Sequence, residues 1–171
     1  MAMIKSNQKG AVMVEFAFVG LLFFIVLFAV LEFSRLLFVW NAVADATRLG
    51  ARAAAVCIVN SDDIANITRS DPTDSGNNPL LPNDLDSSNI QVRYLDENGL
   101  QVMNPDPTNI PGFMQIRYVE VSVINYQHDL LIPLLGGTIT LPPFTTTRPR
   151  EALGILPLAA GVLPTAGNQG C

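Results

Sequence analysis

Few residues in this chain have the type and spacing that catalysis needs. The one histidine, His128, has no cysteine or second histidine at the spacing of metal ligands. The sequence contains no glycine-rich phosphate loop and no G-x-S-x-G elbow. We therefore expect a protein that is not an enzyme and needs no cofactor, with His128 as a surface residue that follows a strand.

A group of aspartates between Asp62 and Asp74 suggests calcium binding. An EF-hand loop requires a fixed spacing of its ligands and a closing glutamate, and this segment has neither. We therefore expect no metal site here. The composition of residues 57–89 is typical of a loop, with a short helix at about 62–69 capped by Ser61 or Asp62.

Glu15 is a lone carboxylate in the apolar run 11–31. A charged side chain costs about 2.5–3.5 kcal/mol at the centre of a bilayer and less near its surface. Two interpretations follow from this cost. Either Glu15 has a positively charged partner, or it lies at the depth of the lipid headgroups, where water solvates it.

The composition divides the chain into two parts. Hydrophobic residues make up 49% of the chain and charged residues 15%, whereas a soluble domain has about a quarter of charged residues. Residues 1–56 carry five basic and three acidic residues, and residues 57–171 carry five basic and twelve acidic ones. The low fraction of charged residues and the high fraction of hydrophobic residues exclude a disordered chain. The charge balance also argues against nucleic acid as a partner, because phosphate binding needs clustered basic residues.

The run 11–31 has the length of a transmembrane helix, since about 20 residues cross the hydrocarbon core. A cleaved secretory signal is the alternative, but its apolar core is only about 7–15 residues long. Here the run is longer, and no A-x-A-like site closes it. Lys5 and Lys9 precede the span, so the positive-inside rule places the N-terminus in the cytoplasm and the C-terminal part outside. Membrane lipid is then a direct partner.

The helix is expected to continue beyond the membrane to residue 56, because no proline and only two glycines interrupt residues 11–56. Such a helix would be roughly 70 Å long. Its apolar residues recur at helical spacing, whereas Arg35, Asp45, Arg48 and Arg52 lie off that stripe, where Asp45 can pair with Arg48. The stripe comprises Leu36, Val39, Trp40, Val43, Ala44, Thr47, Ala51 and Ala54.

Residues 9–16, KGAVMVEF, resemble a type IV prepilin processing site. In that pattern a short basic leader ends in glycine, and a glutamate stands fifth after the cut. The motifs at 14–17, 32–37, 41–42, 45–48 and 50–52 resemble the TadE-like family of the Tad (Flp) pilus system, and residues 119–151 resemble it more weakly. Major Flp pilins usually have tyrosine after the glutamate and little beyond the helix. Here Phe16 and a domain of about 115 residues indicate a minor pilin.

The resemblance implies a set of site residues. A prepilin peptidase would cut between Gly10 and Ala11, and the new amine at Ala11 would neutralise Glu15 of a neighbouring subunit. Glu15 and Phe16 would then act in subunit assembly. The implied partners are other pilins or pseudopilins of the Tad system, the prepilin peptidase and the inner-membrane assembly platform.

The outer part predicts a small antiparallel sheet that packs on the outer half of the helix. Residues 90–95 alternate as a strand, and a turn at 96–99 could return as a hairpin through 100–103. Further strands are expected at 116–126, where Val119, Val121 and Val123 share one face, and then at 136–141 and 144–148. The fold class is therefore α+β, with a long pilin-type helix followed by a small antiparallel sheet domain.

Two cysteines outside the membrane, Cys57 and Cys171, predict a disulfide. The entropic treatment gives a loop of this length about 4–5 kcal/mol. Two unpaired thiols and a link between two chains remain as alternatives. The apolar tail 152–171 is interrupted by prolines and is too short to span a membrane, so we expect it to pack on the domain or on a partner.

These observations predict four segments: a leader at 1–10, a transmembrane helix at 11–31, its periplasmic continuation at 32–56 and a periplasmic loop and sheet domain at 57–171. The functional hypothesis is a TadE-like minor pilin of the bacterial inner membrane. It would act in assembly, priming or capping of a Tad pilus used in adhesion or secretion. The alternative is a single-span anchored periplasmic protein that binds a partner without entering a pilus.

Overall fold

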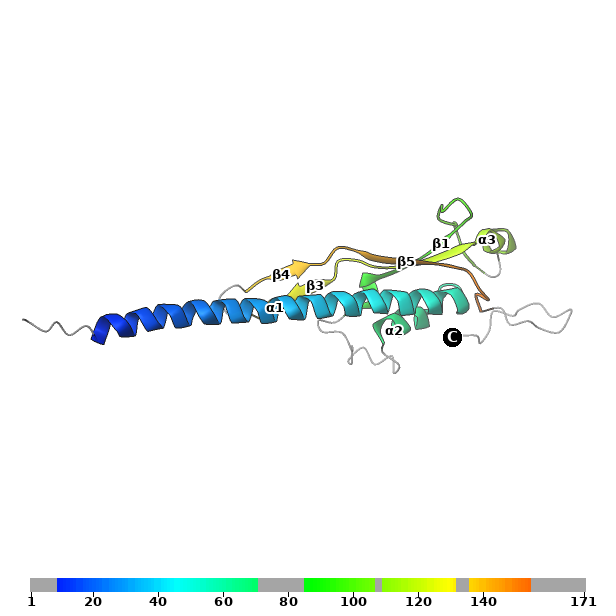
Figure 1. The fold of residues 1–171 in the computed structure, drawn as a ribbon. Coiled ribbons are helices and arrows are strands. Elements are labelled where there is room, and N and C mark those ends of the chain that lie inside the picture. Colours follow the sequence, from blue (N-terminus) through cyan, green and yellow to red (C-terminus); the bar gives the residue numbers. More distant parts are fainter. Residues whose placement is uncertain (1–8, 71–84, 107–108, 132–135, 155–171) are drawn as a thin grey trace, which may run out of the picture.

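The fold is built on one helix, α1, which runs from Lys9 to Val56 without a break. The computed structural model describes residues 9–70, 85–106, 109–131 and 136–154. At about 1.5 Å per residue the 48 residues of α1 span about 72 Å, and Figure 1 shows them as a single rod. This confirms the continuous helix that the apolar spacing predicts.

The rest of the chain forms small elements around the C-terminal half of α1. In chain order they are α2 (Asp62–Arg69), η1 (Ser87–Asn89), β1 (Ile90–Leu95), α3 (Ile110–Gln115), β2 (Tyr118–Val123), β3 (Gln127–Asp129), β4 (Thr138–Thr140) and β5 (Phe144–Pro149). Antiparallel pairing joins three strands in the order β1-β2-β5, and a separate antiparallel pair joins β3 to β4. The fold is therefore α+β, as expected.

The strand predicted at 90–95 occurs with these bounds as β1, and β5 extends the one predicted at 144–148 by one residue, whereas β2 and β4 are shorter than predicted. The strand expected over 116–126 ends as β2 at Val123, because Asn125 adopts a left-handed conformation with φ 53° that turns the chain. The expected return strand at 100–103 is reduced to a single bridge between Leu95 and Gln101. The turn before it is present, since the Asp96 carboxylate accepts the backbone N–H groups of Asn98 and Leu100.

The sheet buries its apolar face against the outer half of α1. Val119, Val121 and Val123 of β2 are at most 1% exposed, which agrees with the alternation read from the sequence. On α1 the buried partners are Val39, Val43, Thr47, Ala51 and Ala54, all on the predicted stripe. Every second side chain of a strand points to the same face of the sheet, and only one stripe of side chains on a helix can contact that face. The core is therefore narrow and elongated.

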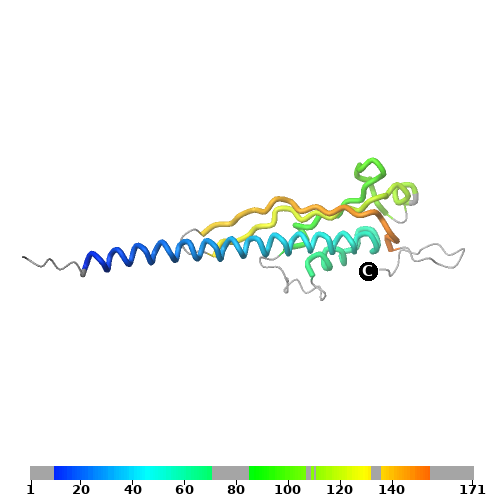
Figure 2. Tube along the Cα trace, viewed as in Figure 1, coloured from blue at the N-terminus to red at the C-terminus, as the bar shows by residue number. Residues whose placement is uncertain are grey.

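Helix α2 and the three-stranded sheet flank α1 on different sides, as the tube in Figure 2 shows. The N-terminus of α2 is capped by Ser61, whose hydroxyl accepts the backbone N–H of Asp63. Ile64 of α2 is 1% exposed and joins the core. The predicted helix and its cap are thus both confirmed.

The C-terminal end of α1 is closed by a distant segment of the chain. The backbone N–H groups of Glu151 and Leu153 donate to the carbonyl of Ala55, and that of Gly154 donates to Val56. The last carbonyls of a helix have no partners within the helix, so these bonds satisfy groups that would otherwise need water. The described chain therefore ends beside the end of α1, and the predicted tail packing of residues 155–171 lies outside the described residues.

Candidate functional site

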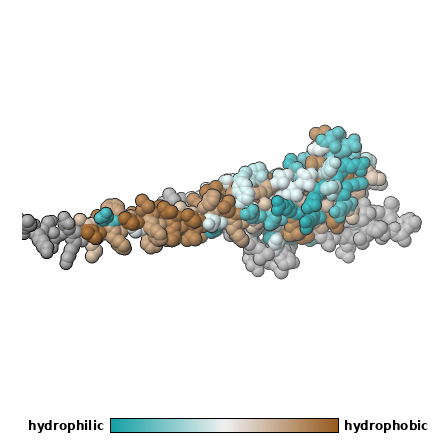
Figure 3. Space-filling view, viewed as in Figure 1, coloured by the Kyte–Doolittle hydropathy of each residue, from teal (hydrophilic) through white to brown (hydrophobic). Residues whose placement is uncertain are grey.

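The N-terminal half of α1 is bare. From Val12 to Leu31 its large apolar side chains are exposed, and no part of its most apolar 18-residue window is buried. The space-filling view in Figure 3 shows this half as a hydrophobic rod that projects from a more hydrophilic domain. The helix is long and apolar enough to cross a membrane. It fits a single-pass membrane anchor.

The predicted processing and assembly residues lie together at the start of this rod. Helix α1 begins at Lys9, so Gly10, Ala11, Glu15 and Phe16 all belong to its first two turns. Ala11 and Glu15 are four residues apart and therefore share one face of the helix. Glu15 is exposed, and Phe16 is 78% exposed. A side chain on Gly10 would meet nothing within 4 Å.

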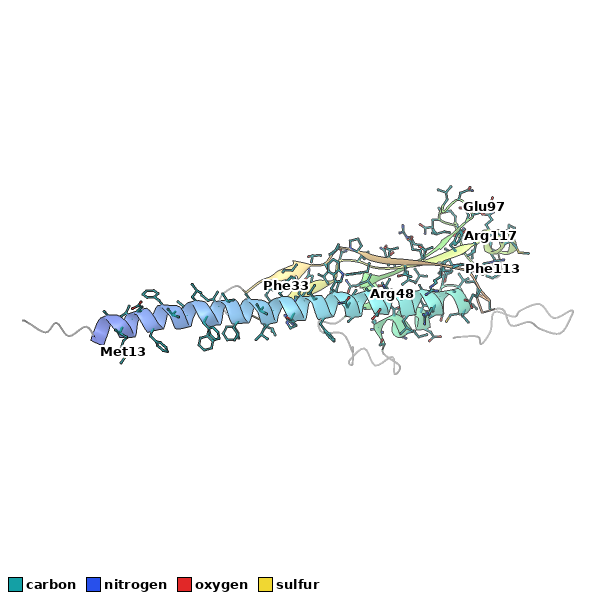
Figure 4. The ribbon with its side chains drawn as sticks, in the orientation of Figure 1. Met13, Phe33, Arg48, Glu97, Phe113 and Arg117 are labelled. Atoms are coloured by element: carbon teal, nitrogen blue, oxygen red, sulfur yellow. The ribbon has the colours of Figure 1, made fainter. Side chains whose placement is uncertain are left out.

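The outer half of α1 carries its exposed charges on the side away from the sheet. Arg48 donates to Asp45 at 2.7 Å, and both side chains are mainly exposed; Figure 4 labels Arg48 on the helix. This is the i, i+3 pair that the sequence suggested. An ion pair with this exposure contributes roughly 0.2–1 kcal/mol to the free energy of unfolding. Its main effect is to keep this face of the helix hydrated.

His128 is not a surface residue, and that prediction is wrong. It lies in the middle of β3 with no exposed surface, while Gln127 and Asp129 on either side are exposed. The alternation of the strand turns His128 toward α1. There its Nε2 lies 3.5 Å from Oε1 of Glu32. The sequence offers no local signal for this contact, because it joins residues that are far apart in the chain.

Glu32 is the centre of a polar cluster between α1 and the β3–β4 pair. Arg35 donates to its Oε1 at 2.7 Å, and the backbone N–H of Leu131 donates to its Oε2 at 3.3 Å. Arg35 also donates to the backbone carbonyl of Asp129. The side chain of Glu32 is 11% exposed and that of Arg35 is 26% exposed. Arg35 therefore faces β3, although the sequence analysis placed it on the charged outer face.

The surroundings of Glu32 favour its ionised form. The hydrogen bond from Arg35 lowers the pKa of Glu32 below its ordinary value of 4.5. Partial burial opposes this shift, while the N–H of Leu131 and the ring of His128 add to it. A partly buried carboxylate that is paired and hydrogen-bonded in this way stays charged at neutral pH. It fastens the β3–β4 pair to the helix at the first turn beyond the apolar run.

Cys57 lies directly after α1 and is 3% exposed. It belongs to the hydrophobic cluster in which the C-terminal end of α1 packs against Val119 and Val121 of β2. Cys171 lies outside the described residues, so its pairing with Cys57 stays a prediction. The aspartates of the suspected calcium segment are only partly described. Within residues 9–70, 85–106, 109–131 and 136–154, no group of three or more His, Cys, Asp or Glu side chains is placed to hold a metal ion.

The comparisons with known proteins bear on α1. The family model described as TadE-like protein matches residues 10–52. These residues include all but the first residue of the predicted processing motif, the apolar rod and most of the helix stripe that packs on the sheet. No curated protein and no solved structure matches the chain. The family resemblance that the motifs indicate is thus confirmed within α1, where the chain is similar to the TadE-like family, and this similarity implies an association with the Tad pilus.

Proposed function

We propose that this protein is a TadE-like minor pilin, a structural subunit that takes part in the assembly, priming or capping of a Tad pilus. The observation that carries the proposal is the bare apolar half of α1 with a single carboxylate, Glu15, near its start. An exposed helix of this kind requires a membrane before assembly and neighbouring helices after it. The match of residues 10–52 to the TadE-like family supports the same role.

The proposed pathway begins in the bacterial inner membrane. Residues 1–10 form a cytoplasmic leader, residues 11–31 span the membrane, and residues 32–56 and 57–171 lie in the periplasm. A prepilin peptidase removes the leader by cutting between Gly10 and Ala11. The peptide bond after Gly10 belongs to α1, so cleavage requires the first turn to open into an extended strand. Glycine eases this step because it gains the most backbone freedom on leaving a helix.

Cleavage supplies the partner that Glu15 needs. The new α-amino group at Ala11 is positively charged, and a charged carboxylate in an apolar environment is stable only when it is paired. In a staggered bundle the amine of one subunit meets Glu15 of the next, with Phe16 packing at the same level. The assembly platform, the other pilins and the peptidase are the proposed protein partners, and a cell-surface fibre is the product.

The mature N-terminus tests this proposal. Mass spectrometry of the protein purified from its own membrane should give a chain that begins at Ala11. Gly10→Leu should leave the precursor uncut. Gly20→Leu is the matched control, because a side chain at Gly20 also meets nothing within 4 Å, and this variant should still be processed.

A wild-type chain that still begins at Met1 or Ala2 would contradict the pilin proposal. It would favour a single-span anchored protein that binds a periplasmic partner, because such an anchor needs neither Gly10 nor Glu15.

A further inference from the structure

Charged residues end the apolar run at Glu32, yet the apolar surface of α1 does not end there. Phe33 is 60% exposed, Leu37 46%, Phe38 67% and Trp40 39%. Phe33, Leu37 and Trp40 follow one another at i, i+4 and i+7 and so form one row along the helix. Phe38 extends a second row, seven residues after the exposed Leu31. The bare surface thus continues for two more turns.

The two charges at this level point away from that surface. Glu32 and Arg35 pair with each other and bind the backbone of the β3–β4 pair. The polar side chains on the remaining faces are also satisfied within the helix. Ser34 donates to the carbonyl of Val30 at 2.8 Å, and Asn41 donates to that of Leu37 at 2.9 Å. The first mainly exposed ion pair beyond Glu15 is that of Asp45 with Arg48.

The β3–β4 pair adds apolar surface at the same level. Leu131 follows β3 and is 69% exposed, and its backbone N–H binds Glu32. Ile139 in β4 is 40% exposed. Figure 4 labels Phe33 beside the region where this strand pair meets α1. We define the interfacial patch as the exposed apolar side chains at this level, which are Phe33, Leu37, Phe38, Trp40, Leu131 and Ile139.

The length of the apolar surface identifies its partner. Residues 11–31 account for about 30 Å of helix, the thickness of the hydrocarbon core. From Leu31 to Trp40 the exposed apolar surface continues for about 14 Å along the helix, so on the outer side it leaves the hydrocarbon core and enters the headgroup layer. The added part contains Trp40, and tryptophan is a residue that concentrates where a bilayer meets water. The patch is continuous with the membrane-crossing surface, so the same solvent covers both.

We propose that the interfacial patch lies in the headgroup layer of the outer leaflet, so that the β3–β4 pair rests on the bilayer. The Glu32 cluster lowers the free-energy cost of this placement, because it pairs the charges of Glu32 and Arg35 between α1 and β3 and keeps them away from the lipid. The contact is apolar, so it does not depend on anionic lipid. The outer domain carries an excess of acidic residues, which would repel such lipid. This inference does not rest on the pilus role.

Trp40 is the only tryptophan of the chain and reports its own depth. The full-length protein is placed in phosphatidylcholine vesicles at a low ratio of protein to lipid. These vesicles contain lipids brominated near the headgroup, at mid-chain or near the chain end. We expect the largest loss of Trp40 fluorescence with the shallow label and the smallest with the deep one. We also expect less quenching by aqueous acrylamide than for a tryptophan in water, and no change of depth with added salt.

Two relocated tryptophans provide matched controls. Trp40→Phe with Leu49→Trp places the probe at a site that is 43% exposed, beyond the patch. It should be quenched by acrylamide and not by any brominated lipid. Trp40→Phe with Phe33→Trp should be quenched by a deeper label than Trp40. Far-UV circular dichroism confirms that each variant keeps its helix.

Two results would overturn the proposal. If Trp40 behaves like the probe at position 49, the domain stands clear of the bilayer. If Trp40 is shielded from both acrylamide and every brominated lipid, and this shielding disappears on dilution with lipid, then a second copy of the chain covers the patch instead.

Discussion

Gly50 shows how one residue sets the distance between two helices. A side chain at this position of α1 would place its Cβ 2.1 Å from Oγ1 of Thr68 and 3.1 Å from its Cβ. Thr68 lies in α2, has no exposed surface and donates to the carbonyl of Ile64 at 2.6 Å. Rotating its hydroxyl away would give up this hydrogen bond and would still leave the Cβ of Thr68 at 3.1 Å. Glycine is therefore required for the close contact of α2 with α1.

Gly50→Ala should destabilise the domain. Alanine favours an isolated helix by roughly 0.5–1 kcal/mol, but overpacking a buried contact costs about 1–3 kcal/mol, and the clash decides the sign. Denaturant unfolding of the full-length protein in micelles should show a lower free energy of unfolding. Thr68→Ala removes the clashing atoms, so the double variant should be more stable than the sum of the single changes predicts. Equal stability of Gly50→Ala and the wild type would contradict this explanation.

Glu15 should be needed for assembly and not for membrane insertion. Glu15→Ala should insert into the membrane at least as well as the wild type, because it removes a charge from an apolar segment. Its recovery in assembled pili should fall, since the new amine at Ala11 would lose its partner. The matched control moves the carboxylate by one residue, as Val14→Glu with Glu15→Ala. This shifts it by about 100° around the helix and should not restore assembly. Wild-type pili from either variant would leave Glu15 a headgroup-level residue.

The β3–β4 pair depends on its contacts with α1, because the hydrogen bonds between its two short strands stabilise it only weakly. It has three residues in each strand, and an isolated two-stranded pair is marginally stable. Its attachment to α1 includes the Glu32 cluster, in which Glu32 accepts the backbone N–H of Leu131 and Arg35 donates to the carbonyl of Asp129. The stability of this element should therefore depend on the charge of Glu32.

Acid should weaken this attachment. Because the hydrogen bond from Arg35 lowers the pKa of Glu32 in the folded protein, the carboxylate stabilises the fold above about pH 4.5. That contribution is lost as the pH falls through the lower folded-state pKa. Glu32→Gln should be less stable than the wild type at pH 7, and the difference should shrink toward pH 3. Thermal unfolding across this range measures it, with the exposed Glu97→Gln as a control that keeps the wild-type profile. A constant difference at all pH values would indicate that only the shape of Glu32 matters.

The two ends of the molecule differ in the variety of surface that they offer to a partner. The apolar half of α1 has one charge and a nearly uniform surface, as Figure 3 shows, whereas the outer domain carries the loops and most of the acidic residues. Specificity requires differences that a uniform apolar helix can hardly supply. Loops on a rigid scaffold commonly carry recognition. We therefore propose that residues 57–171 determine the choice of partner.

Exchanging segments tests this proposal. Residues 11–31 replaced by the matching segment of another pilin, glutamate included, should still support pili in a complementation assay. Replacing residues 57–171 should abolish pili and leave insertion and leader cleavage intact. The junction must keep the end of α1, because Glu151, Leu153 and Gly154 bind its last carbonyls. The opposite pattern would place recognition in the membrane helix.

Features of the fold that depend on neighbouring residues could be predicted from the amino-acid sequence. The period of the apolar stripe predicted α1, the alternation around Val121 predicted β2, and Ser61 marked the start of α2. The motif at 9–16 located the candidate processing and assembly residues, which remain proposals. Each of these signals is local, since backbone geometry repeats within a few residues.

Contacts between segments that are distant in the chain could not be predicted and became visible in the folded protein. Glu32 and Leu131 are 99 residues apart in sequence, and neither the burial of His128 nor the inward turn of Arg35 has a local pattern. The same holds for the strand order β1-β2-β5 and for the fit of Gly50 against Thr68. A side chain is buried or exposed according to what packs on it. The charges that end the apolar run in the sequence therefore do not end the apolar surface of the folded helix.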